Sequence, residues 1–207
     1  RILKISGLNQ VNFLNNILTA DISKLNKREI VPSALLTPQG RILFDLLISF
    51  EHAQKPNEIS SILIECDIVQ IDDLFKKLKM YNLRNEVNIE KTKHKIFVTI
   101  EPENRDNILF DKRFFEMCVG RIYENKELKH DLNNDNALNS YHLLRYKYCV
   151  PEGPMEVINN VSLPLEINLD LLGGLDFEKG CFIGQEVNAR IKWRGLVKKK
   201  YVPITFK

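Results

Sequence analysis

The segment 179–195, KGCFIGQEVNARIKWRG, holds the residues of this chain that are best suited to chemistry. Cys181 lies between Gly180 and Gly184, and glycines permit positive φ angles or a close approach of the backbone to a ligand. The residues 185–192 favour a helix. Cys181 is therefore predicted to lie on a tight loop directly before a helix N-terminus.

Two roles are open for the Cys181 thiol. A helix N-terminus and the nearby Lys179 would lower the pKa of the thiol and make it a nucleophile or a metal ligand. A cysteine also behaves as a small hydrophobic residue, so Cys181 would alternatively pack in a core beside Phe182. The residue types alone do not separate these alternatives.

The predicted helix after Cys181 has favourable internal spacing. Glu186 and Arg190 are four residues apart in the order that supports an ion pair, and Val187 and Ile191 share one apolar face. Glu186 also lies in the first turn, where a negative charge complements the helix dipole. The motif is thus predicted to run from a loop onto a helix.

The other cysteines, Cys66, Cys118 and Cys149, form no Cys-x-x-Cys pair, and the four histidines show no ligand spacing. A zinc or preformed cluster site made by this chain alone is therefore not predicted, and no metal ligands are assigned. Scattered cysteines are typical of reduced thiols in the cytosol, so a cytoplasmic location is expected. Cys66 and Cys118 lie in apolar, strand-like sequence and are expected to be inert core residues.

The segment RILFDLLISF, 41–50, has the alternation of a β-strand. Its even-numbered positions are all apolar, and its odd-numbered positions include Arg41, Asp45 and Ser49. The even set would face a core, and the polar residues would share a second, half-apolar face. Asp45 would then be a partly buried carboxylate in need of a partner, and Arg41 lies too far along the strand, at about 13 Å, to supply one. A structural partner or a polar ligand group such as a pterin ring would meet Asp45.

The composition of the 207 residues, 44% hydrophobic and 28% charged, is typical of a soluble globular chain. No run approaches the roughly 18 apolar residues of a membrane span, so no membrane association is expected. The net charge of +3 is concentrated in residues 190–207, which contain seven lysines or arginines and no acid. This basic end is either an edge strand guarded by lysines or a surface that attracts a polyanion, such as a polyglutamate tail or RNA.

Hydrophobic periodicity predicts an α+β arrangement, with helices between runs of strands. A hairpin is predicted over 30–50, because Pro38-Gln39-Gly40 has the chemistry of a turn. The other predicted elements are a strand at 2–5, a helix through Leu18, a strand at 61–69, a helix at 71–80, strands at 86–89 and 95–101, a polar linker at 124–139, a helix at 137–147 and a strand-like end at 201–207.

KGCFIGQE, at 179–186, resembles the signature of the YgfZ-type folate-binding proteins, Lys-Gly-Cys-aromatic-Ile/Thr-Gly-Gln-Glu. The similarity continues in both directions and covers nearly the whole chain in the right order. The other matching segments are LNQVNFLNNILTADISKL near the start, LLTPQGRILFDLLIS at 35–49, LLRYKYCVPEG at 143–153 and the block from Leu163 to Lys200.

The resemblance implies the three-domain fold of the related glycine-cleavage aminomethyltransferases, arranged around a central folate pocket. The first domain would be discontinuous, 1–32 and 110–195, and the middle α+β domain would be 33–109. Residues 196–207 would begin a C-terminal β-barrel domain that is mostly missing from this sequence. The expected fold is therefore α+β, with antiparallel sheets and flanking helices.

The resemblance also implies a function in the assembly or repair of iron–sulfur proteins, especially [4Fe–4S] proteins. Tetrahydrofolate would be the cofactor, iron–sulfur assembly or client proteins would be the partners, and an effect on tRNA modification would be indirect. Carried over to this chain, Cys181 is the functional thiol. The remaining motif residues are Lys179, Gly180, Gly184, Gln185, Glu186, Arg190 and Arg194, and the expected folate contacts are Asp45, Arg41 and Arg145.

Three positions depart from the aminomethyltransferases. Phe44-Asp45 replaces an acidic pair, Lys147 replaces a glutamate that a helix supplies to the folate pocket, and Cys181 replaces an aspartate. These changes argue against aminomethyl transfer. Within the YgfZ pattern, Cys149 stands where glycine is usual, which leaves the local turn open.

Three functions are carried forward, in this order. The first is a folate-binding accessory factor of iron–sulfur protein assembly that acts through Cys181. The second is a folate-dependent aminomethyltransferase, although a role without enzymatic activity is preferred. The third is an RNA-binding module built on the basic end. Direct RNA binding is ranked last because few aromatic residues, Trp193, Tyr201 and Phe206, accompany these charges.

Overall fold

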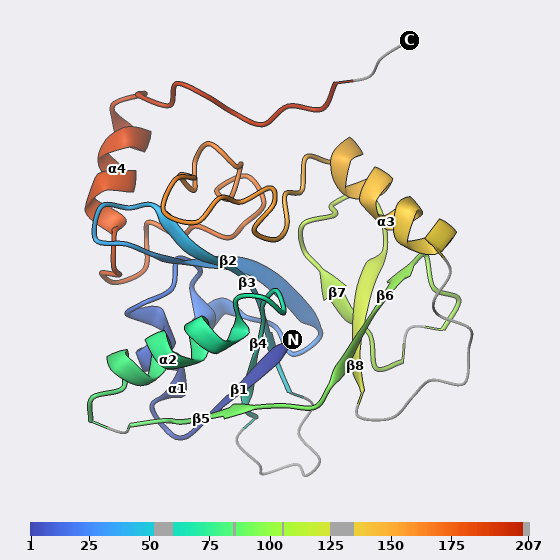
Figure 1. Ribbon diagram of the computed structural model, residues 1–207, viewed down its shortest axis with the longest axis horizontal. Helices are drawn as coiled ribbons and strands as arrows, with labels where there is room; N and C mark the ends of the chain where they lie inside the picture. Colours follow the sequence, from blue (N-terminus) through green and yellow to red (C-terminus); the bar gives the residue numbers. More distant parts are fainter. Residues whose placement is uncertain (52–59, 85, 105, 125–134, 205–207) are drawn as a thin grey trace.

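The computed structural model describes residues 1–51, 60–84, 86–104, 106–124 and 135–204. An eight-stranded sheet forms its centre, with the strand order β5-β1-β4-β3-β2-β7-β8-β6 (Figure 1). The strands are β1 Ile2–Ser6, β2 Glu29–Leu36, β3 Ile42–Phe50, β4 Ile62–Glu65, β5 Asn88–Lys91, β6 Lys95–Ile100, β7 Leu109–Asp111 and β8 Val119–Glu124. The helices are α1 Gln10–Asn15, the short 3-10 helix η1 Ile22–Lys24, α2 Ile71–Tyr81, α3 Asp135–Lys147 and α4 Gln185–Trp193.

The predicted α+β class with flanking helices is confirmed. The sheet is mixed rather than wholly antiparallel, because β2 and β7 pair in parallel, with Glu29 beside Phe110 and Ile30 beside Asp111. Parallel neighbours need a long crossover, and here the chain passes through β3, β4, α2, β5 and β6 between them. The division into domains at residues 32, 109 and 195 stays a prediction.

The hairpin of β2 and β3 matches the sequence prediction. Its turn is closed by hydrogen bonds from the Thr37 N–H to the Arg41 carbonyl, at 2.8 Å, and from the Gly40 N–H to the Thr37 carbonyl, at 2.9 Å. Gly40 has a φ of +78°, which a residue with a side chain rarely adopts. The hairpin is the longest strand pair and lies in the middle of the sheet.

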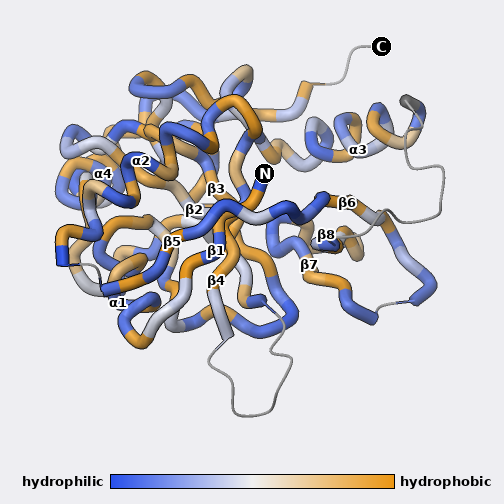
Figure 2. Tube along the Cα trace, turned by 60° about the horizontal axis from the view of Figure 1, so that its bottom comes forward, coloured by the Kyte–Doolittle hydropathy of each residue, from blue (hydrophilic) through white to orange (hydrophobic). Residues whose placement is uncertain are grey.

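Both faces of β3 are covered, as its half-apolar second face predicted. Phe44, Leu46 and Ile48 pack in the larger core with residues of β1, β4, α1 and α2. On the second face, Leu47 and Ser49 are also buried. Figure 2 shows the hydrophobic residues following the inner strands, whereas α2 carries hydrophilic residues as well.

A long segment without regular elements, residues 148–184, forms most of the second layer. It crosses the sheet near β2 and β3 in Figure 1, and its Leu165, Ile167 and Phe182 pack with Leu36 and Ile42. Its packing is apolar, but its backbone is built from turns.

Three boundary predictions need correction. The first helix ends at Asn15 rather than at Leu18, and Leu18 instead bridges to Leu35 of β2. Residues 201–204 form no strand, because no neighbouring strand pairs with them among the described residues. The linker predicted at 124–139 lies mostly outside the described residues, whereas the helix that follows it is confirmed as α3.

The hairpin turn and the N-terminus of α4 interlock. Gly184 caps α4 with a φ of +78°, and a Cβ atom there would lie 2.5 Å from the Thr37 carbonyl oxygen and 3.0 Å from the Gly40 Cα. Asn188, fully buried, donates from Nδ2 to the Gly40 carbonyl at 2.9 Å and to the Gly184 carbonyl at 3.1 Å. The helix after Cys181 is thus fixed against the hairpin.

Replacing Gly184 tests this interlock. Gly184→Ala should lower the free energy of unfolding by about 2 kcal/mol or more, because alanine adds backbone strain and a clash with backbone atoms. Gly180→Ala is the matched control in the same motif, since a Cβ at Gly180 would meet nothing within 4 Å. Urea denaturation of the two variants measures the difference, and equal stabilities would contradict the interlock.

Candidate functional site

Cys181 lies where the sequence predicted, on a short loop before α4. Its side chain is exposed, whereas the neighbouring Phe182 is 6% exposed and packs in the core. The alternative in which Cys181 is a buried packing residue is therefore wrong. The loop ends at Gly184, which is the N-cap residue of α4.

Lys179 does not simply lie beside the thiol as a free cation. Its ammonium donates to the carbonyl oxygens of Asn15, at 2.9 Å, Ala20, at 2.7 Å, and Leu18. It also lies 4.9 Å from the centre of the Phe182 ring. Burial lowers the pKa of this ammonium from its ordinary value of 10.5 to about 8, against the opposing charges of Asp21 and Asp176.

The predicted pair on α4 is formed, with Arg190 Nη2 donating to Glu186 Oε1 at 2.9 Å. Both side chains are largely exposed, so the pair contributes little to stability. Arg194 caps the C-terminal end of the helix through its backbone N–H, which donates to the Arg190 carbonyl. The charged part of the motif therefore lies on a solvent-facing helix.

Asp45 lies on β3 at the wall of a cavity of about 290 Å³. Its Oδ2 accepts a hydrogen bond from the Gly153 N–H at 2.8 Å, whereas its Oδ1 is buried without a partner among the described residues. Burial raises the pKa of the Asp45 carboxyl, and the Gly153 hydrogen bond offsets this only in part. The sequence required a partner for Asp45, and the structure supplies one for a single oxygen.

The rest of the cavity wall is mixed in character. Cys66 is buried there as expected, and burial together with the charge of Asp45 raises the pKa of its thiol to about 12. The thiol therefore stays protonated at neutral pH. The other lining residues include Pro32, Ser33, Leu46, Leu47, Arg113, Pro151, Glu152, Ile167, Leu169 and Leu172.

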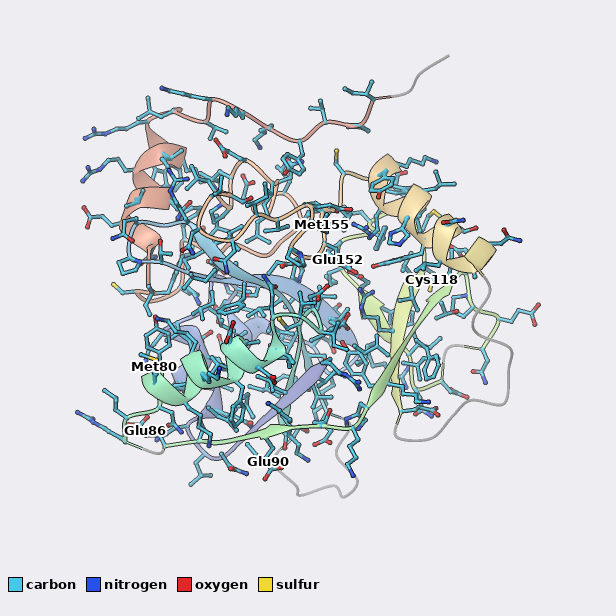
Figure 3. All side chains as sticks on the ribbon, viewed as in Figure 1. Met80, Glu86, Glu90, Cys118, Glu152 and Met155 are labelled. Carbon is cyan, nitrogen blue, oxygen red and sulfur yellow. The ribbon has the colours of Figure 1, made fainter. Side chains whose placement is uncertain are left out.

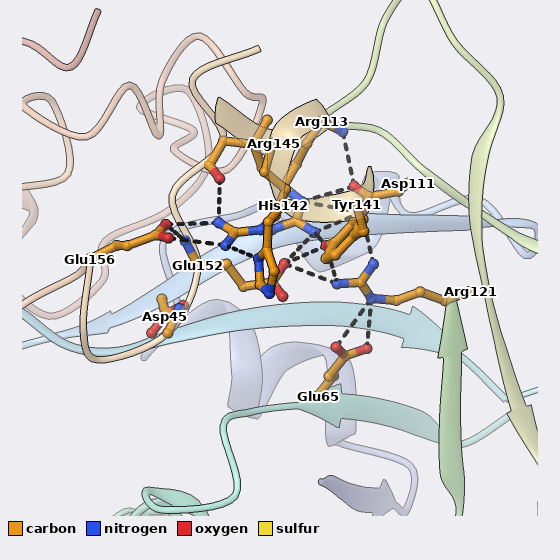
Figure 4. A network of polar contacts seen from close by, with 12 residues as sticks. Asp45, Glu65, Asp111, Arg113, Arg121, Tyr141, His142, Arg145, Glu152 and Glu156 are labelled. Carbon is orange, nitrogen blue, oxygen red and sulfur yellow. Dashed lines mark hydrogen bonds and ion pairs between the residues drawn. The ribbon is translucent and has the colours of Figure 1, made fainter. Parts of the chain in front are cut away.

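Glu152, which sequence reasoning did not single out, joins the cavity to a buried network of charges (Figure 4). Its Oε2 lies 2.8 Å from Arg113 Nη2 and 3.0 Å from Arg121 Nη2, and it accepts from the Tyr141 hydroxyl at 2.8 Å. Figure 3 shows Glu152 in the middle of the molecule, whereas Glu86 lies at its edge. Burial alone would raise the pKa of Glu152, but the two arginines and Tyr141 bring it well below its ordinary value.

The two arginines of this network are almost fully buried. Arg113 is 3% exposed and pairs with Asp111 at 2.7 Å, and Arg121 is 1% exposed and pairs with Glu65 at 2.9 Å. The signal in the sequence was an arginine, Arg121, in a strand-like apolar segment. Asp111 lies only two residues from Arg113, but Glu65 lies 56 residues before Arg121, so that pair could not be assigned from the sequence.

Arg145 and Arg41, the other expected folate contacts, lie elsewhere. Arg145 binds Glu156 at 2.7 Å and the Val150 carbonyl at 2.9 Å, and it lines a second, open groove of about 1,040 Å³. Arg41 donates to the Val161 carbonyl at 2.6 Å and lines neither space. The structure therefore does not gather Asp45, Arg41 and Arg145 around one cavity.

The second groove contains the position at which the family pattern has glycine. Cys149 has a φ of +51°, a left-handed conformation that favours glycine. It ends α3 in a Schellman motif, in which the Cys149 N–H donates to the Tyr146 carbonyl and the Val150 N–H to the Arg145 carbonyl. The local turn is thus kept despite the side chain, and Cys149 lines the groove with Lys147 and residues 200–204.

Cys118 does not match its prediction as an inert core residue. It is half-buried, in the turn before β8, and its N–H donates to Glu101 at 2.7 Å. In the part of the chain that the structure describes, no three histidine, cysteine or acidic residues are placed to hold a metal ion. No described helix is both long and apolar enough to cross a membrane.

Comparison with known proteins gives relatives over almost the whole chain. A mitochondrial iron–sulfur cluster assembly factor IBA57 homolog of Neurospora crassa is 29% identical and is matched over 98% of this chain and 51% of its own length. The homolog of Pyricularia oryzae is 30% identical over 98% of this chain and 54% of its own length, and the human IBA57 is 30% identical over 83% and 52%. The homologues of this chain are IBA57 proteins of the YgfZ family. The chain spans about half the length of these relatives, and no family model matches it.

The fold has a counterpart of known structure. The glycine cleavage system aminomethyltransferase T of Bartonella henselae matches 93% of this chain and 61% of its own, with a TM-score of 0.62 and 14% sequence identity. This confirms the aminomethyltransferase-like fold that the resemblance implied. The names of the IBA57 relatives place them in mitochondria, so the expected cytoplasmic location is contradicted.

Removing the charge of Glu152 tests the buried network. Glu152→Gln should lower the free energy of unfolding at pH 7 by about 2 kcal/mol, because Arg113 and Arg121 lose a shared anion. The folded-state pKa of Glu152 is depressed, so its contribution is present above the ordinary value of 4.5 and is lost as the pH falls below it. Urea denaturation between pH 3 and 7 should thus show the two proteins converging in acid.

The matched control is Glu86→Gln, which alters an exposed carboxylate at the edge of the molecule. Its stability should follow that of the wild type at every pH. A Glu152→Gln variant that also follows the wild type would contradict a stabilising network.

Proposed function

We propose that this chain acts in the assembly or repair of iron–sulfur proteins, especially [4Fe–4S] proteins, with Cys181 as the acting thiol. The observation that carries the proposal is the placement of Cys181, exposed on a loop whose two ends are anchored in the fold. The IBA57 names of the relatives support the same role. An effect on tRNA modification would be indirect, through clients that carry such clusters.

The Cys181 thiol would lose its proton and bind iron of a cluster in transit as a thiolate. A [4Fe–4S] cluster takes four ligands, and one cysteine supplies one of them. Cys66 is buried, and no described group of side chains completes a metal site near Cys181. The remaining ligands would therefore come from an assembly or client protein, or from a small thiol, and Cys181 must be exposed to share them.

We further propose that the cavity at Asp45 holds the ring of a reduced folate. Asp45 Oδ1 is a buried acceptor without a described partner, and such a group is costly unless a donor meets it. The amino and ring N–H groups at the edge of a pterin supply paired donors. The volume of about 290 Å³ suits one fused ring rather than an entire folate. A bound reduced folate would contribute the capacity to carry one-carbon units.

The second candidate, aminomethyl transfer, is suggested by the fold match alone. Phe44, at the position of an expected acid, is 6% exposed in the larger core and cannot meet a ligand. Lys147 brings a cation to the position of an expected glutamate and lies over the Tyr148 ring. Formation of methylenetetrahydrofolate from a methylamine donor would restore this candidate.

Folate binding should depend on Asp45 and on pH. Asp45→Asn should weaken binding of tetrahydrofolate by about tenfold, because one acceptor becomes an amide that presents donors of its own. Ligand donors favour the ionised carboxylate, whose pKa is raised in the free protein, so binding should release protons and weaken as the pH falls. Isothermal titration calorimetry in buffers of different ionisation enthalpy measures both effects.

Asp67→Asn is the control, because Asp67 lines the same cavity but its Oδ1 already accepts from the Val69 N–H at 2.8 Å. Its affinity should stay near that of the wild type. No binding by the wild-type protein, or equal binding by Asp45→Asn, would argue against this use of the cavity.

The role of Cys181 is tested in cells that lack the endogenous homologue. The full-length protein that contains this chain should restore the activity of a [4Fe–4S] enzyme, and its Cys181→Ala form should leave that activity at the level of the deficient cells. Cys118→Ala, a change to another accessible thiol, should restore it fully. Equal rescue by Cys181→Ala at equal protein levels would show that the thiol has no chemical part.

A further inference from the structure

The Cys181 loop has two exposed residues between a half-buried residue, Lys179, and a buried one, Phe182. Lys179 and Phe182 direct their side chains into the fold, whereas Gly180 and Cys181 are exposed. Among the described residues, no hydrogen bond holds either Gly180 or Cys181. The position of the thiol is therefore set by its neighbours.

The ammonium of Lys179 is matched to its acceptors. It has three N–H donors, and the carbonyl oxygens of Asn15, Leu18 and Ala20 accept from it. These carbonyls belong to the chain at and beyond the end of α1, where helical partners run out. Leu18 and Ala20 are buried, so loss of their donor would leave polar groups away from water.

Other contacts hold residues 174–176, the base of the loop, against the segment that follows α1. The Asp176 N–H donates to the Thr19 carbonyl at 3.0 Å, and Thr19 Oγ1 donates to the Gly174 carbonyl at 2.6 Å. Lys24 binds the Asp176 carboxylate at 2.7 Å, and that carboxylate accepts from the Lys179 backbone N–H. Between Asp176 and Cys181, Phe177 packs against the apolar second layer, and the Lys179 side chain supplies the hydrogen bonds to the segment at the end of α1.

We propose that Lys179 is the positioning residue of the Cys181 site. Its ammonium binds the three carbonyls at and beyond the end of α1 and thereby fixes the exposed thiol in one orientation for a partner. The inference rests on the proposed function, and it gives Lys179 a part other than activation of the thiol. Gly180, with open space around its Cα, leaves the approach to Cys181 unobstructed.

Global stability, measured by urea denaturation, is the matched readout for the loop. Loosening of the loop without loss of global stability would distinguish positioning from a general weakening of the fold.

The experiment compares the whole chain as wild type, Lys179→Met, Lys179→Arg and Lys24→Met. Hydrogen–deuterium exchange of the Glu178 and Lys179 amides, which donate to Asp176, reports on the loop. The rate of Cys181 alkylation, corrected for the thiolate fraction and read on its peptide by mass spectrometry, reports on the thiol. Lys179→Met should speed exchange about tenfold at pH 7, from the lost hydrogen bonds. Lys179→Arg should recover part of the protection, and Lys24→Met, on the base of the same loop, should change it about twofold at most.

Lys179→Arg covers the case in which Lys179→Met fails to fold. Its planar guanidinium keeps the charge but cannot donate to the three carbonyls as an ammonium does, so its loop should exchange faster than that of the wild type. Equal protection in the wild type and a folded Lys179→Met, or in the wild type and Lys179→Arg where Lys179→Met does not fold, would overturn the proposal. Failure of Cys181→Ala to impair cellular rescue, with a loosened Lys179→Met loop, would instead overturn only the proposed function and leave the loop's positioning intact.

Discussion

Two buried arginines impose the main constraint on this fold. Arg121 of β8 reaches Glu65 of β4, although three strands lie between them in the sheet. In a flat sheet these strands would be about 19 Å apart, at about 4.8 Å per step. The pair at 2.9 Å therefore requires a strongly bent sheet. A buried guanidinium without its carboxylates would be very costly, so the bend and the network depend on each other.

The same network determines the surroundings of Asp45. Arg113 and Arg121 hold Glu152, and the next residue, Gly153, donates its N–H to Asp45. One carboxylate oxygen thus receives a backbone hydrogen bond, while the other is buried without a described donor. Because burial also disfavours the charge of Asp45, the ligand proposed for the cavity would present N–H groups rather than an anion.

Local patterns in the sequence were sufficient for the elements that position Cys181. The Pro38-Gln39-Gly40 turn, the alternation of β3 and the spacing of α4 each gave the observed structure, because each is decided by neighbouring residues. The charge network was not accessible in this way, since Glu65, Arg121 and Glu152 meet only after the sheet bends. For Cys149, the resemblance marked a position at which glycine is usual, but the sequence did not show whether the left-handed turn is kept. The direction of Lys179, toward carbonyls near α1, depends on a contact across more than 150 residues.

The thiol and the cavity are separate places on one scaffold. Cys181 does not line the cavity, and Asp45 does not reach the loop of Cys181. The β2–β3 hairpin connects them, since its turn at Gly40 receives Asn188 of α4, and Asp45 lies five residues further along β3. The layer over the sheet provides a second connection, because Leu169 and Leu172 line the cavity a few residues before the Lys179 anchor. An influence of the proposed folate on the thiol would pass through these connections, as expected of a ligand that stabilises the site rather than one that reacts directly with Cys181.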